Sequence, residues 1–227
     1  MARWASSLAA AGVVLFVIGP LLAHVGTLPA LGGFLVFGIG GLFGLIAFVL
    51  GLIAAARGAG TGRGLVIGAA VSAVFVAMAL PGRGVPRIND ITTDTSNPPQ
   101  FVTATTLPAN HGRDMAYPGA TFAEQQHAGY PDLGPLRMTV PPDEAFKRVE
   151  AAVRGMPDFE ISRVDPATHA LEGIATTRLF RFHDDFVIEV RPDGTGSLVE
   201  MRSKSRDGKG DVGANAARIR AVFAKLS

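Results

Sequence analysis

The sequence predicts a three-helix transmembrane anchor followed by an α+β domain, in which a four-stranded antiparallel sheet is flanked by two amphipathic helices. Three observations indicate this fold class. Three long apolar runs with almost no charge open the chain. Four short segments in the second half have the lengths and residue types of β-strands. Two segments with helical apolar spacing enclose these four. The chain therefore divides into an anchor (1–82), a linker (83–87) and a soluble domain (88–227).

The apolar runs cover about 4–25, 30–56 and 64–82. A helix needs about 20 apolar residues to cross a bilayer, so the third run is long enough only if its ends lie in the interface. The first run could instead be a signal peptide, but no clear small-x-small cleavage site follows it and two more apolar runs come directly after. His24, near the end of the first run, is the one ionisable residue in the three runs, which argues against transport.

Glycine is frequent in the second run, where Gly40 and Gly44 form a G-x-x-x-G motif. Small residues at this spacing let membrane helices approach closely, but glycine is also generally common in such helices. The sequence leaves both explanations open. If the motif contacts another membrane protein, the chain is an accessory subunit of a membrane complex.

The charge distribution predicts an orientation. The first eighty residues contain no acidic residue, and their only cations are Arg3, Arg57 and Arg63. The net charge of +2 is thus +3 from this part and −1 from the rest, which has 18 Lys and Arg against 19 Asp and Glu. We expect a multi-pass protein of the bacterial inner (cell) membrane, with a cytoplasmic N-terminus and an extracytoplasmic C-terminal domain. Because the excess charge lies outside the domain, nucleic acid is not an expected partner.

The elements of the domain follow in order. Prolines and acidic residues at 141–144 begin a helix that Gly155 and Pro157 end. Strands are expected at 159–164, 170–177, 186–190 and 198–203, and Pro192-Asp193-Gly194 predicts a hairpin turn. The last helix is expected to begin at Asp211 as its N-cap and to bury a stripe of apolar residues. That stripe is Val212, Ile219, Val222, Phe223 and Leu226.

The region between the linker and the first helix of the domain has weaker signals. Residues 88–92 could form a short edge strand, and 102–138, which lacks sustained periodicity, is expected to be a long ordered or semi-ordered excursion. Oxygen atoms of Asp90, Thr93 and Asp94 could bind a hard cation, but turn formation explains them more simply. His111 and His127 are expected to be solvated. The chain has no cysteine, and we predict no cofactor and no metal site.

The densest polar chemistry lies where the last strand meets the last helix. A basic, glycine-rich turn before a helix can bind an anion, because free N–H groups and the helix dipole both favour negative charge. A corner braced by internal ion pairs is the competing explanation, since Asp207 and Asp211 lie in the same turn. The candidate ligand-binding residues are Ser203, Ser205, Arg206, Lys209, Asn215 and Arg218.

A second chemistry is conceivable at His183-Asp184-Asp185. A histidine beside carboxylates could act as an acid–base pair in an envelope hydrolase, but a solvated strand end is the simpler interpretation. The sequence contains no G-x-S-x-G, H-E-x-x-H or P-loop motif. An extracytoplasmic domain that binds a partner protein or an anionic envelope component is the function we expect.

Three segments resemble the domain-of-unknown-function 1499 family. They are Ile88 to Asp94, Tyr130 to Leu133 and Ser203 to Ile219, and the resemblance covers most of residues 86–227. Phe159 stands where a tryptophan is expected in the family, which concerns local packing alone. The resemblance implies membrane-anchored bacterial relatives with apolar helices ahead of the domain. It implies no activity, because the family has no established catalytic or binding residues.

Overall fold

The computed structural model describes residues 1–59 and 62–226, and the chain forms two compact units. Unit 1 contains Met1–Arg83 together with Arg178–Arg181. Unit 2 contains Gly84–Thr177 and Phe182–Ser227.

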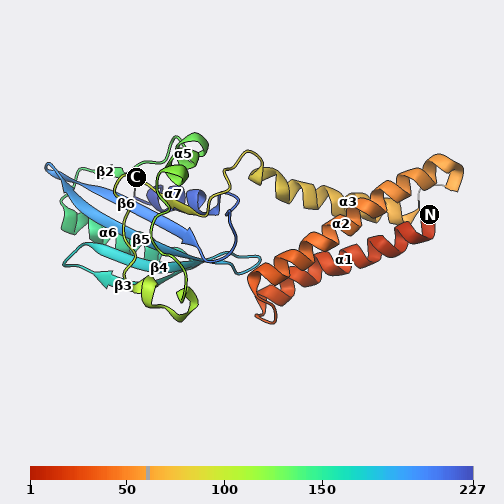
Figure 1. The fold of residues 1–227 in the computed structure, drawn as a ribbon, viewed down its shortest axis with the longest axis horizontal. Coiled ribbons are helices and arrows are strands. Elements are labelled where there is room, and N and C mark those ends of the chain that lie inside the picture. Colours follow the sequence, from red (N-terminus) through yellow and green to blue (C-terminus); the bar gives the residue numbers. More distant parts are fainter. Residues whose placement is uncertain (60–61, 227) are drawn as a thin grey trace. The chain divides into compact units, whose positions relative to one another are not determined.

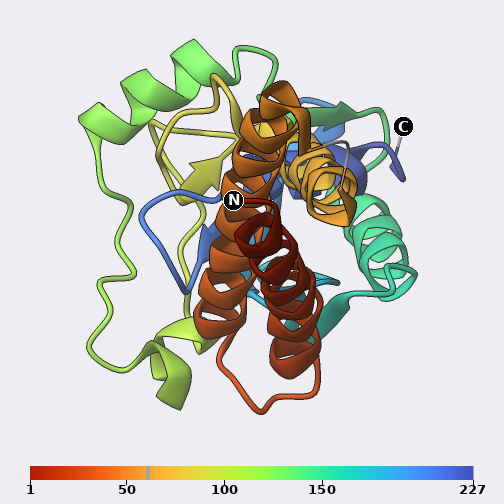
Figure 2. The same cartoon turned by 90° about the vertical axis from the view of Figure 1, so that its right-hand side faces the viewer.

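Unit 1 consists mainly of three apolar helices that run side by side (Figures 1 and 2). These are α1 (Ala2–His24), α2 (Ala30–Ala54) and α3 (Arg63–Ala79). A π-helical turn, Ala55–Ala59, extends α2, and a 3-10 turn, Leu80–Gly82, follows α3. Among the described residues, two helices are long and apolar enough to cross a membrane, whereas α3 is a shorter apolar helix of 17 residues. The expected third span therefore forms a helix, but one below the usual spanning length.

Small residues form the contacts between the three helices. A side chain on Gly40 would collide with the backbone of Phe16 in α1, and one on Gly44 would collide with Val71 in α3. The G-x-x-x-G motif therefore packs within this chain. Large apolar side chains point outward instead, and Val17, Leu35 and Val66 are more than half exposed. Unit 1 thus has mostly small residues inside, together with Phe37 and Val71, and most of its large apolar residues outside.

The segment 178–181, which connects two strands in the sequence, belongs to unit 1. The Phe180 side chain is buried, and its ring centroid lies 5.3 Å from those of both Phe34 and Phe37. The carbonyl oxygen of Arg178 lies 3.3 Å from Nδ1 of His24. This short segment therefore completes the packing of unit 1.

Unit 2 is built on a six-stranded antiparallel sheet (Figure 1). Its four main strands are β3 (Phe159–Asp165), β4 (Ala170–Thr176), β5 (His183–Asp193) and β6 (Gly196–Ser205). These four are the predicted ones, and they pair in the order β3-β4-β5-β6. Gly194, with φ of 61°, lies in the predicted turn between β5 and β6.

Two short strands correct the prediction of a four-stranded sheet. They are β1 (Asp90–Thr92) and β2 (Leu136–Met138), and both pair with the outer edge of β6. β1 pairs with residues 202–204 and β2 with residues 197–199, so they share one edge without overlapping. A three-residue strand has too little alternation to be recognised in the sequence, which explains why β2 was missed.

One face of the sheet is apolar, and two helices cover it. Leu171, Phe186, Ile188 and Met201 are fully buried on this face. The predicted amphipathic helices, α6 (Pro142–Arg154) and α7 (Ala214–Phe223), pack their apolar side chains into the same core. The sequence prediction of two helices over one face is therefore confirmed.

The other face of the sheet is lined with charged residues, and segment 94–118 covers it. Phe101, Ala104 and Met115 from this segment pack on Val187 of β5. In Figure 1 the segment crosses in front of the sheet, whereas α6 lies behind it. The segment contains the short helix α4 (Thr103–Thr106) and a 3-10 turn, Pro108–Asn110, and α5 (Ala120–Gly129) follows it. The excursion expected over 102–138 thus contains short regular elements, which the sequence analysis did not identify.

Candidate functional site

The predicted ligand-binding residues lie where β6 ends and α7 begins, and four of them form one hydrogen-bond network. Ser203 Oγ donates to Asn215 Oδ1 at 2.7 Å, and Asn215 Nδ2 donates to Ser205 Oγ at 2.9 Å. Arg218 Nη1 donates to Asn215 Oδ1 at 2.6 Å, and its Nη2 lies 2.5 Å from Asp184 Oδ2. We call these five residues the polar corner. Asn215 and Ser203 are fully buried in it.

Arg206, the fifth predicted residue, pairs with Asp185 on the opposite face of the sheet. Its Nη2 lies 2.6 Å from Asp185 Oδ1, and Arg113 lies 3.6 Å from the other oxygen of the same carboxylate. Asn110 also donates to that oxygen at 3.0 Å. Lys209, the sixth residue, is exposed on the turn. The structure thus groups four candidates, places Arg206 beside a different carboxylate and leaves Lys209 in solvent.

A buried ion triad lies beside this pair, and the sequence analysis missed it. Asp90 accepts from Arg202 Nε and Nη2, and from Lys204 Nζ, at 2.8 Å each. Arg202 is fully buried and also donates to the carbonyl oxygens of Pro99 and Met115. Its guanidinium lies over the Phe101 ring at 4.8 Å and the Tyr117 ring at 5.6 Å. We call Asp90, Arg113, Asp185, Arg202, Lys204 and Arg206 the charged layer.

Glu172 holds the start of α4 on this charged face. Its carboxylate accepts backbone N–H bonds from Val102, Thr103 and Ala104 at 2.9–3.1 Å. Arg163 Nη1 lies 3.2 Å from the same carboxylate. A buried carboxylate with this number of donors is fully compensated. Glu172 therefore fixes the position of segment 94–118 over the sheet.

Asp211 fills the role expected of an N-cap, but three residues before the helix. Its two carboxylate oxygens accept from the N–H groups of Gly213 and Asn215 at 2.8 and 2.9 Å. Burial raises the pKa of Asp211 despite these bonds. Helix α7 begins at Ala214 and not at Asp211, because Val212 and Gly213 have positive φ angles of 55° and 86°. Val212, expected in the buried stripe, is consequently 59% exposed.

The carboxylates of the proposed acid–base group at 183–185 are paired with arginines. Successive side chains on a strand point to opposite faces, so His183 and Asp184 diverge. Asp184 and Asp185 are buried and paired with Arg218 and Arg206, and the expectation of a solvated strand end was wrong for both. His183 Nδ1 lies 3.0 Å from Thr176 Oγ1 at the exposed end of the strand.

The candidate cation residues form turns and ion pairs. Asp94 Oδ1 accepts from the N–H groups of Ser96 and Asn97 at 2.8 and 3.0 Å, so the turn interpretation is confirmed for this residue. Asp90 belongs to the ion triad, and Thr93 Oγ1 accepts from the N–H of Met201. No group of three metal-binding side chains occurs in the part of the chain that the structure describes. His111 is exposed, and His127 Nε2 lies 3.1 Å from Thr95 Oγ1.

Three buried polar atoms have no hydrogen-bond partner in the described part of the chain: Tyr117 Oη, Tyr130 Oη and Glu200 Oε2. Burial raises the pKa of Tyr117 and of Tyr130 to about 12. Glu200 Oε2 lies 2.8 Å from Arg191 Nη2 without hydrogen-bond alignment. Burial raises the pKa of Glu200, and this effect outweighs the opposing attraction of Arg191.

The charged layer and the polar corner together carry excess positive charge. Their cations are Arg113, Arg202, Lys204, Arg206 and Arg218, five in all, and their carboxylates are Asp90, Asp184 and Asp185. Asp211, beside the corner, is a fourth acidic residue. Cations therefore outnumber carboxylates even when Asp211 is ionised. The exposed Lys209 adds to this excess on the same turn, although Asp207 offsets it.

The sequence contained a signal for the charged layer. Glu200, Arg202 and Lys204 alternate along β6 with Val199, Met201 and Ser203. Such alternation normally indicates a solvated face. The residues that cover the charged face come from about 100 positions earlier in the sequence. Pro99, for example, lies 103 residues before Arg202, which donates to its carbonyl oxygen. No local pattern could therefore show that the charged face is buried.

The fold defines a class of protein with apolar N-terminal helices ahead of a mostly antiparallel sheet domain. The chain belongs to the family described as Protein of unknown function (DUF1499), whose model matches residues 90–226. No curated protein matches the chain. A solved structure of Ara h 8.0201 is similar over 40% of this chain and 91% of its own, at 14% identity and a TM-score of 0.31. A similarity at this level does not define the fold.

Proposed function

We propose that this protein is a multi-pass integral membrane protein whose α+β domain lies outside the cytoplasm and binds an anionic ligand of the cell envelope. The helices of unit 1 supply the anchor. The excess of cations over carboxylates in the charged layer and the polar corner, together with the exposed Lys209 on the β6–α7 turn, supplies the attraction for the ligand. The membrane part and the binding part are supported by different observations, and each has its own test.

The distribution of residue sizes in unit 1 supports the membrane part. A helix that forms the core of a soluble protein buries its large apolar side chains. Here most buried positions are small, as at Ala9, Gly40 and Gly68, and Phe37 and Val71 are the larger buried residues of α2 and α3; Trp4 and Val17 are 72% and 61% exposed. Small residues between helices and large apolar residues outside are the arrangement found in lipid. Helix α3 can complete a third span if its ends extend through the interface.

The cysteine-free sequence allows a direct test of insertion and orientation. Single cysteines can be introduced as Ala2→Cys in unit 1 and Thr195→Cys in the exposed β5–β6 turn. In intact cells, a membrane-impermeant maleimide should label the second variant alone, and permeabilised cells should show both. The protein should also remain in the membrane after alkaline carbonate washing. Labelling of Ala2→Cys alone in intact cells would reverse the orientation, and release by carbonate would contradict the anchor.

Excess positive charge is the observation that supports anion binding. Of the six candidate residues, Ser203, Asn215 and Arg218 are committed to internal hydrogen bonds, so the ligand is expected at the exposed turn and not within the network. Lys209 is the candidate in solvent there. Asp211 already accepts from the N–H groups of Gly213 and Asn215 at the start of α7, so side-chain charge is expected to provide most of the attraction.

Thermal unfolding of the full chain in mild detergent tests this binding. The ligands are inorganic phosphate, nucleotides, soluble lipid head groups and cell-wall fragments. A ligand that binds only the folded state adds about 2.7 kcal/mol at a hundred times its dissociation constant. The Lys209→Ala variant should retain its stability and lose most of the ligand-induced shift. Lys225→Ala is the matched control, because Lys225 is also exposed but lies near the C-terminus.

Other functions become preferable if no ligand shifts the transition. A protein partner that copurifies in mild detergent would then replace the anion as the ligand. The G-x-x-x-G motif no longer supports the accessory-subunit hypothesis, because Gly40 and Gly44 contact helices of the same chain. The hydrolase hypothesis would need turnover of an ester, phosphate or glycoside substrate that is lost in His183→Ala.

A further inference from the structure

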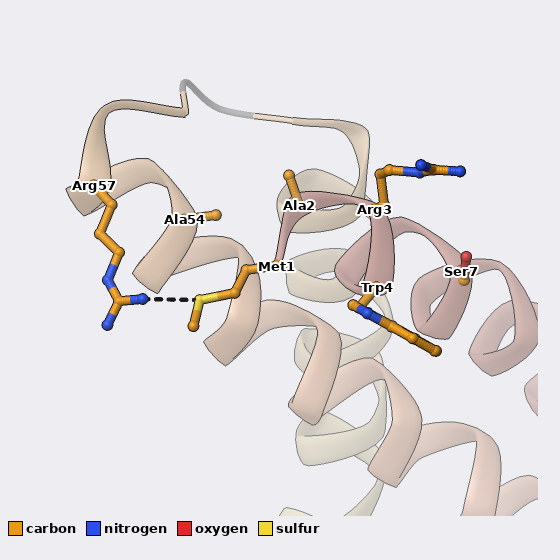
Figure 3. A pocket seen from close by; sticks show the side chains of 7 residues that line it. All are labelled: Met1, Ala2, Arg3, Trp4, Ser7, Ala54 and Arg57. Carbon is orange, nitrogen blue, oxygen red and sulfur yellow. Dashed lines mark hydrogen bonds between the residues drawn. The ribbon is translucent and has the colours of Figure 1, made fainter.

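A hollow with two arginines lies at the Met1 end of unit 1. It is lined by Met1, Ala2, Arg3, Trp4, Ser7, Ala54 and Arg57, and its volume is about 780 Å³. Figure 3 shows the Arg57 and Arg3 side chains extending to opposite sides of the first turn of α1, with the Trp4 ring beside α1. Arg57 Nη1 lies 3.3 Å from the sulfur of Met1, a weak acceptor that leaves the other guanidinium donors available.

No carboxylate of unit 1 can neutralise these arginines. Residues 1–82 contain no aspartate and no glutamate, and the segment 178–181 contributes none either. This differs from the charged layer of unit 2, where Arg202 and Arg206 each have a carboxylate partner. Arg3 and Arg57 are exposed, so their charge is directed outward. The hollow therefore carries positive charge that its own unit does not balance.

The surroundings of the hollow fit the depth of lipid head groups. It lies at the ends of two helices that are long and apolar enough to span a bilayer. Trp4 is 72% exposed, and tryptophan is enriched at the boundary between hydrocarbon and head groups. Ser7, one turn further along α1, also lines the hollow. The apolar wall would accept the upper part of an acyl chain, and Arg57 would face the phosphate.

We propose that this hollow binds the head group of an anionic phospholipid, with Arg57 contacting the phosphate oxygens and Arg3, on the other side of the first turn of α1, adding electrostatic attraction. The inference rests on the proposed membrane location. Guanidinium groups bind phosphate through paired, charge-assisted hydrogen bonds, which favours arginine for this role. An anionic phospholipid carries a net negative charge that a zwitterionic lipid lacks. The two arginines attract this charge without a competing carboxylate, so the anionic lipid is expected to bind more tightly.

Trp4, the single tryptophan of the chain, makes the site directly observable. The full chain is reconstituted in phosphatidylcholine vesicles that contain a brominated quencher lipid, either phosphatidylglycerol or phosphatidylcholine, at matched mole fractions. Quenching of Trp4 by the two quenchers gives their relative association constant at the site. We expect phosphatidylglycerol to be preferred, and each of Arg3→Gln and Arg57→Gln to lower the preference about fivefold.

Arg83→Gln is the matched control, since Arg83 follows the other end of α3 and lies outside the hollow. It should keep the preference of the unmodified chain. Circular dichroism of the three variants should show equal helix content. Equal quenching by the two lipids, or a loss of preference that is the same in Arg83→Gln, would overturn the proposal.

Two further outcomes distinguish a failure of the proposed lipid site from a failure of the proposed membrane anchor. Inorganic phosphate that relieves quenching, when chloride at equal ionic strength does not, would show that the hollow takes a soluble phosphate and would overturn the lipid assignment. Absence of quenching by either brominated lipid would show that Trp4 is not at a membrane, and it would overturn the proposed anchor together with the site. Equal quenching by both lipids removes the site but leaves the anchor intact.

Discussion

Arg202 shows how a permanent charge is accommodated in the interior of unit 2. It is fully buried, and its partners are the Asp90 carboxylate, two carbonyl oxygens and two aromatic rings. Burial of an ion is costly, and removal of one partner leaves the other charge uncompensated. The contacts of Arg202 therefore make it a structural residue and not a ligand-binding one.

Replacement of Arg202 by methionine should lower the free energy of unfolding by about 3–5 kcal/mol, because Asp90 would keep Lys204 as its one cationic partner. Urea unfolding measures this change. Arg137→Met is the control, since the exposed pair of Arg137 with Asp193 should contribute less than about 1 kcal/mol. Similar losses in the two variants would contradict this account of the triad.

Glu200 leads to a prediction about pH. Burial raises the pKa of Glu200 above its ordinary value of 4.5. At a pH between the pKa of the unfolded state and that of the folded state, the folded state therefore holds a proton that the unfolded state has released. The free energy of unfolding must therefore fall as the pH rises through this window. The Glu200→Gln variant has no carboxyl group at this position to titrate. Its free energy of unfolding minus that of the unmodified chain should therefore rise with pH across the window and then become constant.

Urea unfolding of both proteins at a series of pH values from acidic to neutral gives this difference. Asp132 is a useful comparison, because the hydrogen bond from Arg220 lowers its pKa. Asp132→Asn should therefore show the opposite sign and a smaller amplitude, since the pair is exposed. A difference for Glu200→Gln that does not vary with pH would refute the assignment.

At the scale of the elements, α2 offers a test of helix packing within a single helix. A side chain at Gly40 would collide with the backbone of α1, whereas one at Gly38 would meet nothing within 4 Å. Gly40→Leu should destabilise the detergent-solubilised chain by about 1–3 kcal/mol, as overpacking does in other cores. Gly38→Leu should have little effect. Thermal unfolding monitored by circular dichroism compares the two, and equal midpoints would contradict the packing of α1 on α2.

The elements also show which parts of the fold the sequence can predict. β5 and β6 were predicted because long alternation and the Pro192-Asp193-Gly194 turn agree. Helix α5 was missed because its buried residue is Gln126, which hydrogen-bonds to both the N–H and the C=O of Thr92. A helix held by a polar side chain at the edge of a sheet lacks the apolar stripe that identifies other helices.

The candidate site was predictable in location but not in chemistry. Ser203, Asn215 and Arg218 were expected near one another because a tight turn joins β6 to α7. Their carboxylate partner, Asp184, is 34 residues from Arg218 and was expected in solvent. Ion pairs across a sheet depend on strand register, and a single sequence gives no direct information about register.

At the scale of the whole molecule, unit 2 has a core of its own. The core residues, from Ile88 to Val222, all belong to this unit. A fragment of residues 84–227 should therefore fold cooperatively without the helices. Phe180 belongs to unit 1, where it contacts Phe34 and Phe37, so the fragment would expose its ring.

Phe180→Ser should accordingly reduce aggregation of the fragment and change its free energy of unfolding by less than about 0.5 kcal/mol. Size-exclusion chromatography and urea unfolding measure the two effects. Phe186→Ser is the contrasting variant, because Phe186 is fully buried in the core of unit 2 and its loss should unfold the fragment. An unfolded fragment with intact Phe186 would contradict the independence of unit 2.

The pairing of β1 with β6 has a consequence for biosynthesis. Asp90 is among the first residues of the domain, yet its strand and its ion partners are supplied by residues 202–204. The sheet therefore cannot be completed until nearly the entire domain has been synthesised. If the domain is exported as proposed, this late closure would leave the nascent chain without a completed sheet until most of the domain has crossed the membrane.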